Sequence, residues 1–78
     1  MTTDTDIPFE LKYRREAYKT VQGKMVRDTA KDAELPDTPP QFHACFGSYQ
    51  HVSREAVRLN EVQLRSGFLH YLFFPEPA

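Results

Sequence analysis

A nearly continuous apolar run occupies residues 68–74, close to the C-terminus. It holds four of the ten aromatic residues of the chain, which are Phe68, Tyr71, Phe73 and Phe74. Either the protein's own core or a partner must cover this surface, because exposed apolar patches on soluble monomers are usually small. Leu69 and Leu72 are apolar as well, which predicts a central strand buried on both faces. We expect this strand to stop at Pro75 and to leave Phe68 and Phe74 as its most accessible ends.

The length of the chain sets a limit on its stability. A domain of 78 residues buries only about 60 to 65% of the surface that its unfolded chain exposes. A partner or a second copy would therefore add stability, and a homo-oligomer is compatible with the sequence. Cys45 is the only cysteine, so no disulfide can form within the chain.

The start of the chain is polar and acidic and lacks the features of a signal peptide. The longest apolar run, at residues 68–74, is too short to cross a membrane. We expect an intracellular, cytoplasmic protein with a disordered tail at residues 1–6 and a single small domain at residues 7–78.

Charges of both signs are mixed along the chain. Ten Lys and Arg stand against eleven Asp and Glu, for a net charge of -1. A strongly basic balance usually accompanies phosphate binding, so nucleic acid is not the favoured partner.

Residues 7–34 are rich in good helix formers, and we predict an N-terminal amphipathic helix here. Thr5 or Asp6 would cap it, and Pro8 is tolerated in a first turn. Opposite charges occur at helical spacing, as in Glu10 with Arg14. The apolar residues Leu11, Tyr18, Val21 and Met25 would share one side of this helix.

The same segment also carries a strand pattern. Phe9, Leu11 and Tyr13 alternate with charged residues, as in a half-buried strand. Gln22 and Gly23 could close a hairpin, and Gly23 would cost a helix about 1 kcal/mol relative to Ala. We favour the helix and expect any error to fall near Phe9.

Three of the six prolines lie within residues 35–40, where no helix can continue. Proline favours extended backbone before it, so this segment is predicted to be a stiff connection. The spacing of Pro36 and Pro39 also occurs in ligands of proline-reading domains, but it is weak evidence because it is common by chance.

The C-terminal half is predicted to be rich in β-structure. We expect a short helical or mixed segment near Ser53–Leu59, then a strand around Val62 and Leu64. A turn at residues 66–67 would pair it with the final strand in a hairpin. A helix opened at Ser53 and closed near Gly67 is the alternative. The predicted fold is α+β, with the N-terminal helix followed by a proline-rich connection and a β-hairpin or small antiparallel sheet.

Three potential metal ligands, His43, Cys45 and His51, lie within nine residues. Imidazole and thiolate are ordinary zinc ligands, and His70 could be a fourth. Their spacing matches no usual ligand pattern, so a buried cysteine with surface or hydrogen-bonded histidines is the preferred interpretation. A Cys/His nucleophile pair is weaker still, since no further catalytic motif accompanies it. We expect no enzyme activity, no metal and no cofactor.

The favoured function is a small non-catalytic protein-interaction module, either an accessory subunit of a larger assembly or a regulator or inhibitor that docks on a larger protein. Large aromatic residues dominate binding hot spots, so two sets of contact residues are predicted. The first is the C-terminal set of Phe68, Tyr71, Phe73 and Phe74, and the second is Tyr13, Arg14 and Tyr18 on the N-terminal segment. Single-stranded nucleic-acid binding by the Tyr, Arg and Lys residues of that segment is the alternative.

Overall fold

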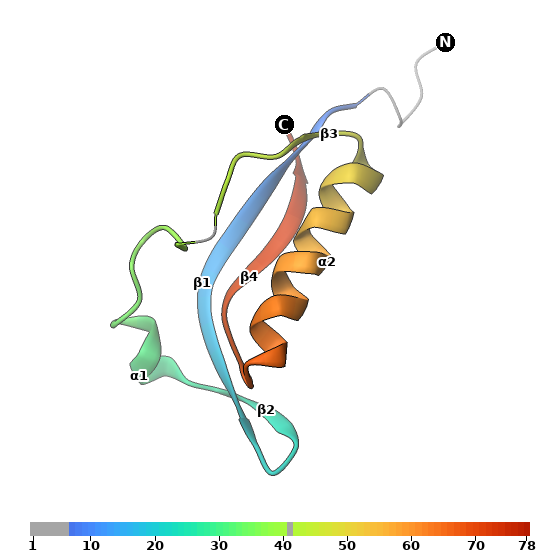
Figure 1. The fold of residues 1–78 in the computed structure, drawn as a ribbon. Coiled ribbons are helices and arrows are strands. Elements are labelled where there is room, and N and C mark those ends of the chain that lie inside the picture. Colours follow the sequence, from blue (N-terminus) through green and yellow to red (C-terminus); the bar gives the residue numbers. More distant parts are fainter. Residues whose placement is uncertain (1–6, 41) are drawn as a thin grey trace.

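The computed structural model describes residues 7–40 and 42–78, so the predicted tail at residues 1–6 and the predicted caps Thr5 and Asp6 lie outside the described residues. Its elements, in chain order, are β1 (Phe9–Val21), β2 (Lys24–Arg27), α1 (Thr29–Asp32), β3 (Phe46–Gly47), α2 (Tyr49–Arg65) and β4 (Phe68–Pro77). Figure 1 shows the two long strands β1 and β4 side by side, with α2 running along β4.

The sheet is antiparallel and is organised around β1. β4 pairs with β1 from Phe9 to Lys19. The first residues of β1 also pair with β3, and its last residues pair with β2. Since the same β1 residues bond to β4, both short strands must lie on the opposite edge of β1.

The predicted N-terminal helix is wrong, because residues 9–21 and 24–27 are strands. The alternation of Phe9, Leu11 and Tyr13 was the correct signal. Gln22 and Gly23 both have positive φ, at 52° and 79°, as a tight two-residue hairpin turn requires. The only helix in the described part of this segment is the single turn of α1.

The charges that suggested a helix instead pair along one face of a strand. The Lys12 ammonium contacts Glu10 at 2.9 Å, and the Arg14 guanidinium lies 4.0 Å from Glu16. These pairs are two residues apart, the spacing that places side chains on the same face of a strand. The chain follows the strand pattern because β4, whose residues lie 49 to 68 positions beyond their β1 partners in the sequence, supplies a partner along nearly the whole length of β1.

The helix of the C-terminal half is longer than predicted. Ser48 caps α2 by accepting the N–H of His51 at 3.2 Å, and the helix continues to Arg65. The predicted strand around Val62 and Leu64 is therefore wrong, and so is the hairpin that it would form with β4. The buried positions of α2 recur at helical spacing and are Val52, Ala56, Leu59 and Gln63.

The strand predicted at residues 68–74 is confirmed, but it lies at the edge of the sheet and not in its centre. Its outer backbone groups are bound by side-chain amides of α2. Asn60 bonds the N–H and the carbonyl of Phe73, at 2.9 and 3.1 Å. Gln63 does the same for Tyr71, at 3.0 and 2.7 Å. The helix thus covers an edge that would otherwise be free to pair with another chain.

The same geometry explains why β4 continues through Pro77 when it was expected to stop at Pro75. The N–H groups of Tyr71 and Phe73 point away from β1 and toward α2. Pro75 and Pro77 follow at steps of two, so their nitrogens face the same outer edge. Their missing N–H groups remove no bond to β1.

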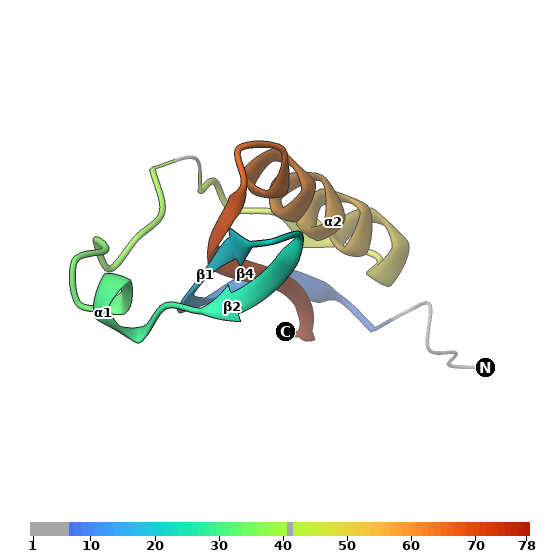
Figure 2. The same ribbon diagram turned by 90° about the horizontal axis from the view of Figure 1, so that it is seen from below.

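The main core lies on one face of the sheet, between the strands, α2 and the segment that follows α1. Its buried members are Leu11, Ala17, Leu35, Val52, Ala56, Leu59, Tyr71 and Phe73. Tyr13 packs edge-on against Phe42 and Tyr71, with ring centroids 5.0 and 6.0 Å apart. In the view along the strands, α2 lies on one side of the sheet and the long connection lies at its flank (Figure 2). None of the helices formed by residues 7–40 and 42–78 covers the opposite face.

Candidate functional site

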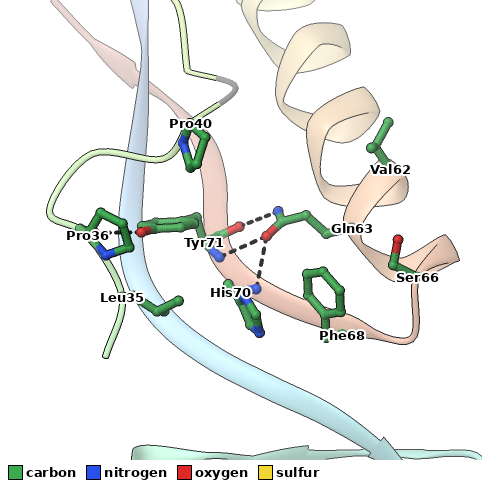
Figure 3. Close-up of a pocket in the computed structure, with 9 residues that line it drawn as sticks. All are labelled: Leu35, Pro36, Pro40, Val62, Gln63, Ser66, Phe68, His70 and Tyr71. Carbon is green, nitrogen blue, oxygen red and sulfur yellow. Dashed lines mark hydrogen bonds between the residues drawn. The ribbon is translucent and has the colours of Figure 1, made fainter. Parts of the chain in front are cut away.

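A pocket of about 270 Å³ opens between the proline-rich connection, the last turns of α2 and the start of β4. Its lining is mostly apolar and consists of Leu35, Pro36, Pro40, Val62, Gln63, Ser66, Phe68, His70 and Tyr71 (Figure 3). The predicted connection at residues 35–40 is therefore more than a link between elements, because it forms one wall of this pocket.

A local irregularity in the sheet brings His70 and Tyr71 to the same pocket. Neighbouring residues of a regular strand point to opposite faces. Here the register shifts between Arg15 and Tyr18, and the N–H groups of His70 and Tyr71 both donate to Oε1 of Gln63, at 2.9 and 3.0 Å. Two successive N–H groups that point the same way are the mark of a β-bulge. The bulge lets both side chains line the same pocket.

The wall formed by the connection is held by long-range contacts of two side chains, Tyr71 and Arg15. The buried Tyr71 hydroxyl donates to the carbonyl of Pro36 at 2.5 Å. The Arg15 guanidinium donates to the carbonyl of Leu35 at 3.1 Å and pairs with Asp37 at 2.9 Å. Burial raises the pKa of Tyr71, so its hydroxyl stays protonated and able to donate at neutral pH.

His70 contributes its imidazole ring to the pocket wall. Its ring stacks on Phe68 with centroids 4.1 Å apart, and no hydrogen bond to its ring nitrogens is present in the described structure. Burial lowers the pKa of His70 below 6.5, and Lys31 lowers it further, while Asp28 raises it. The imidazole is therefore mainly neutral at pH 7.

The predicted contact residues divide among three places. Phe68 and Tyr71 come together in the pocket. Phe73 and Tyr13 pack in the core, where Phe73 is only 2% exposed. The others, Arg14, Tyr18 and Phe74, lie near the opposite face of the sheet, so the set predicted on an N-terminal helix is split between the two faces of a strand.

On that opposite face, arginine side chains lie over the aromatic rings. The Arg14 guanidinium is 5.5 Å from the centre of the Phe74 ring, and Arg27 is at the same distance from Tyr18. The aliphatic parts of such side chains shield apolar surface from water. This face is thus partly covered by its own charged residues.

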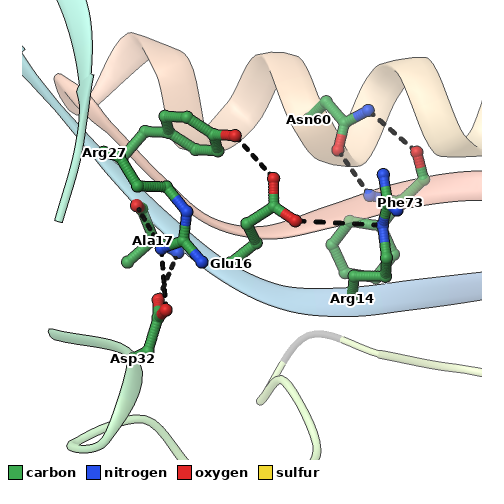
Figure 4. Close-up of polar contacts among 8 residues, drawn as sticks. Arg14, Glu16, Ala17, Arg27, Asp32, Asn60 and Phe73 are labelled. Carbon is green, nitrogen blue, oxygen red and sulfur yellow. Dashed lines mark hydrogen bonds and ion pairs between the residues drawn. The ribbon is translucent and has the colours of Figure 1, made fainter. Parts of the chain in front are cut away.

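Acidic groups pair with both arginines (Figure 4). Arg27 contacts Asp32 at 2.7 Å, while Glu16 lies near Arg14 and accepts the Tyr18 hydroxyl. Asp32 also accepts the N–H of Ala17 at 2.7 Å, and this bond, followed by Arg27, lowers the pKa of Asp32. The positive charges of the face are therefore largely balanced locally.

The structure does not assemble the weak metal candidates. His43 contacts Glu55 at 2.6 Å, Cys45 is half-buried beside the core, and the His51 ring lies against Gly47. Within residues 7–40 and 42–78, no group of three or more His, Cys, Asp or Glu side chains is placed to hold a metal ion.

Several pocket residues were not singled out from the sequence as functional. Gln63 could have been found as the one polar residue on the buried stripe of α2, had the full helix been recognised. Leu35, Pro36 and Pro40 gave no such signal, because their position over β4 depends on the tertiary structure.

Comparisons with protein-family models, with curated proteins and with solved structures found no match. Across the described ranges, none of the helices is both long enough and apolar enough to span a membrane.

Proposed function

We propose that this protein is a non-catalytic interaction module that docks on a larger protein, as an accessory subunit or a regulator, and that the pocket receives a side chain of its partner. The observation that carries the proposal is the apolar pocket beside Phe68 and Tyr71. At about 270 Å³ it is slightly smaller than the roughly 300 to 1,000 Å³ typical of small-molecule sites. It is suited to one large side chain, the usual form of a binding hot spot.

The surroundings of the pocket support the same interpretation. Val62 lines it and is 44% exposed, and the pocket wall also includes Phe68, which is half-buried. Apolar residues next to an anchor pocket exclude water from a bound partner. On the opposite face, Arg14 and Arg27 lie over aromatic rings and shield part of their surface from a partner.

A displayed random-peptide library tests this proposal. Peptides are selected on the wild-type protein and then measured against Val62→Glu, which places a carboxylate at the pocket. Val57→Glu is the matched control, because Val57 is 50% exposed on the same helix and does not line the pocket. We expect selected peptides to share a large apolar residue and to bind Val62→Glu at least about tenfold more weakly, since a buried unpaired charge is strongly unfavourable. Equal affinities for the two variants would contradict the proposal.

Single-stranded nucleic-acid binding is the alternative function. It is favoured by the two arginine–aromatic pairs on the opposite face, which resemble a surface for stacked bases. The ion pairs of Arg14 and Arg27 with Glu16 and Asp32 weigh against it. Fluorescence anisotropy with a labelled oligodeoxythymidine distinguishes the two functions, because phosphate binding would weaken steeply with salt. We expect no such salt-dependent binding.

A further inference from the structure

We propose that the pocket selects an aromatic side chain that carries a hydrogen-bond donor, tyrosine or tryptophan, and that the imidazole of His70 accepts its hydrogen bond. This inference rests on the proposed function and adds the chemistry of the partner's anchor. It follows from the hydrogen bonds of the pocket, which engage the polar groups of Gln63 and Tyr71 but not the ring nitrogens of His70.

Apart from the exposed Ser66, the other polar side chains of the pocket already form hydrogen bonds within the fold. The Gln63 carboxamide bonds the backbone of Leu59, His70 and Tyr71, with four contacts of 2.7 to 3.3 Å. The Tyr71 hydroxyl donates to Pro36. Pro36 and Pro40 have no N–H to offer. Away from His70 and Ser66, a ligand therefore meets walls that are apolar or already bonded.

His70 differs from these groups because its ring nitrogens have no bond in the described structure. A neutral imidazole offers one acceptor and one donor nitrogen. Stacking on Phe68 holds the plane of the ring, so the direction of its acceptor is restricted. The Ser66 hydroxyl also lines the pocket, but Ser66 is exposed and stays in contact with water.

This arrangement matches a side chain with an apolar body and one polar tip. The phenol of tyrosine and the indole of tryptophan both combine an aromatic ring with a donor. A phenylalanine or leucine anchor would cover the His70 acceptor without replacing its bond to water. We expect a loss of between about 3- and 10-fold in affinity for such anchors, as for one missing hydrogen bond.

The charge of His70 gives the inference a second, independent readout. A protonated imidazole donates from both nitrogens and can no longer accept. The charged groups that act on His70 are Lys31 of α1 and Asp28 before it, and the pocket residues from α2 are uncharged. Burial is the largest influence and lowers the pKa of His70 below 6.5. The preference of the pocket for an anchor side chain with a hydrogen-bond donor should therefore be present at pH 7. It should disappear as the pH falls through the pKa of His70.

The test uses the acetylated amides of tyrosine, phenylalanine and leucine as probes, titrated into the whole protein and followed by amide chemical shifts of Phe68, His70 and Tyr71. We expect the tyrosine amide to bind between about 3- and 10-fold more tightly than the other two at pH 7. Its advantage should vanish as the pH is lowered through the pKa of His70, and the ring proton shifts of His70 in the same samples report when the imidazole is protonated. It should also vanish in His70→Phe, which keeps the stacked ring but removes the acceptor.

The outcomes separate this inference from the proposed function. If all three amides shift the pocket resonances with equal affinity, the role of His70 is wrong while the anchor pocket stands. If none of them does, the role of His70 is wrong. The anchor pocket is wrong as well if displayed peptides also fail to distinguish Val62→Glu from Val57→Glu. The nitrogen shifts of the His70 ring give a further check, because the phenylalanine amide would remove the bond to water and move the shift of the unprotonated nitrogen. The tyrosine amide would replace that bond and should move the same shift less.

Discussion

The carboxamide of Gln63 binds both backbone groups of Tyr71: Nε2 donates to the carbonyl at 2.7 Å and Oε1 accepts the N–H at 3.0 Å. A neighbouring strand would normally make these two bonds. Asn60, one helical turn earlier, does the same for Phe73. Two amide side chains at i,i+3 on a helix thereby replace a β-strand at the edge of the sheet.

Gln63→Leu should destabilise the protein by about 2 to 4 kcal/mol, because it leaves two buried backbone groups of Tyr71 without partners. Urea unfolding measures the loss. Gln50→Leu is the control, since Gln50 is exposed on the same helix, and its effect should stay within about 0.5 kcal/mol. Similar losses in the two variants would show that the bonds to Tyr71 contribute little.

Asn60→Ala should expose one backbone amide selectively. The Phe73 N–H loses its acceptor, so its hydrogen exchange should accelerate by at least about tenfold beyond any global loss of stability. The adjacent Leu72 N–H faces β1 and serves as the internal control. If both amides accelerate equally, the strand is opening as a whole and Asn60 does not protect its edge.

Phe73→Ala and Phe74→Ala should differ sharply although the residues are adjacent. Phe73 is 2% exposed in the core, and truncation of a buried phenylalanine typically costs about 3 to 5 kcal/mol. A domain this small has little more stability than that, so Phe73→Ala should be largely unfolded by circular dichroism. Phe74 is only partly buried beneath Arg14, and Phe74→Ala should remain folded. If Phe73→Ala remained folded, Phe73 would again be a candidate for contact with a partner.

Asp32 should make stability depend on pH in the acid range. The N–H of Ala17 and the Arg27 guanidinium hold its pKa below 3.8 in the folded protein. A depressed folded pKa means that the contribution is fully present above pH 3.8 and is lost as the pH falls through the folded value. Urea midpoints measured from about pH 7 down to about pH 2 should fall less steeply for Asp32→Asn than for wild type.

Glu61→Gln is the control for that measurement, because Glu61 is exposed on α2 and makes no ion pair in the described structure. Its pH profile should follow that of the wild type. If the profile of Asp32→Asn also follows the wild type, Asp32 does not cause the loss of stability in acid.

The sequence by itself determined the local signals of the fold. The apolar run predicts the strand at β4, and the alternation from Phe9 to Tyr13 is the pattern of β1. Gly23 and Gly67 mark turns in which the backbone angle φ is positive, at 79° and 89°. Residues other than glycine rarely adopt this conformation. These features depend only on neighbours in the chain, so they can be read without the rest of the protein.

The tertiary structure alone decided between helix and strand for residues 7–34 and assembled the pocket. Both periodicities were present in that segment, and the long pairing of β1 with β4 favours the strand. The place of Pro36 over Tyr71, and the bulge that turns His70 into the same pocket, depend on contacts between residues far apart in the chain. A local pattern holds no information about such contacts, because they form only when distant segments pack together.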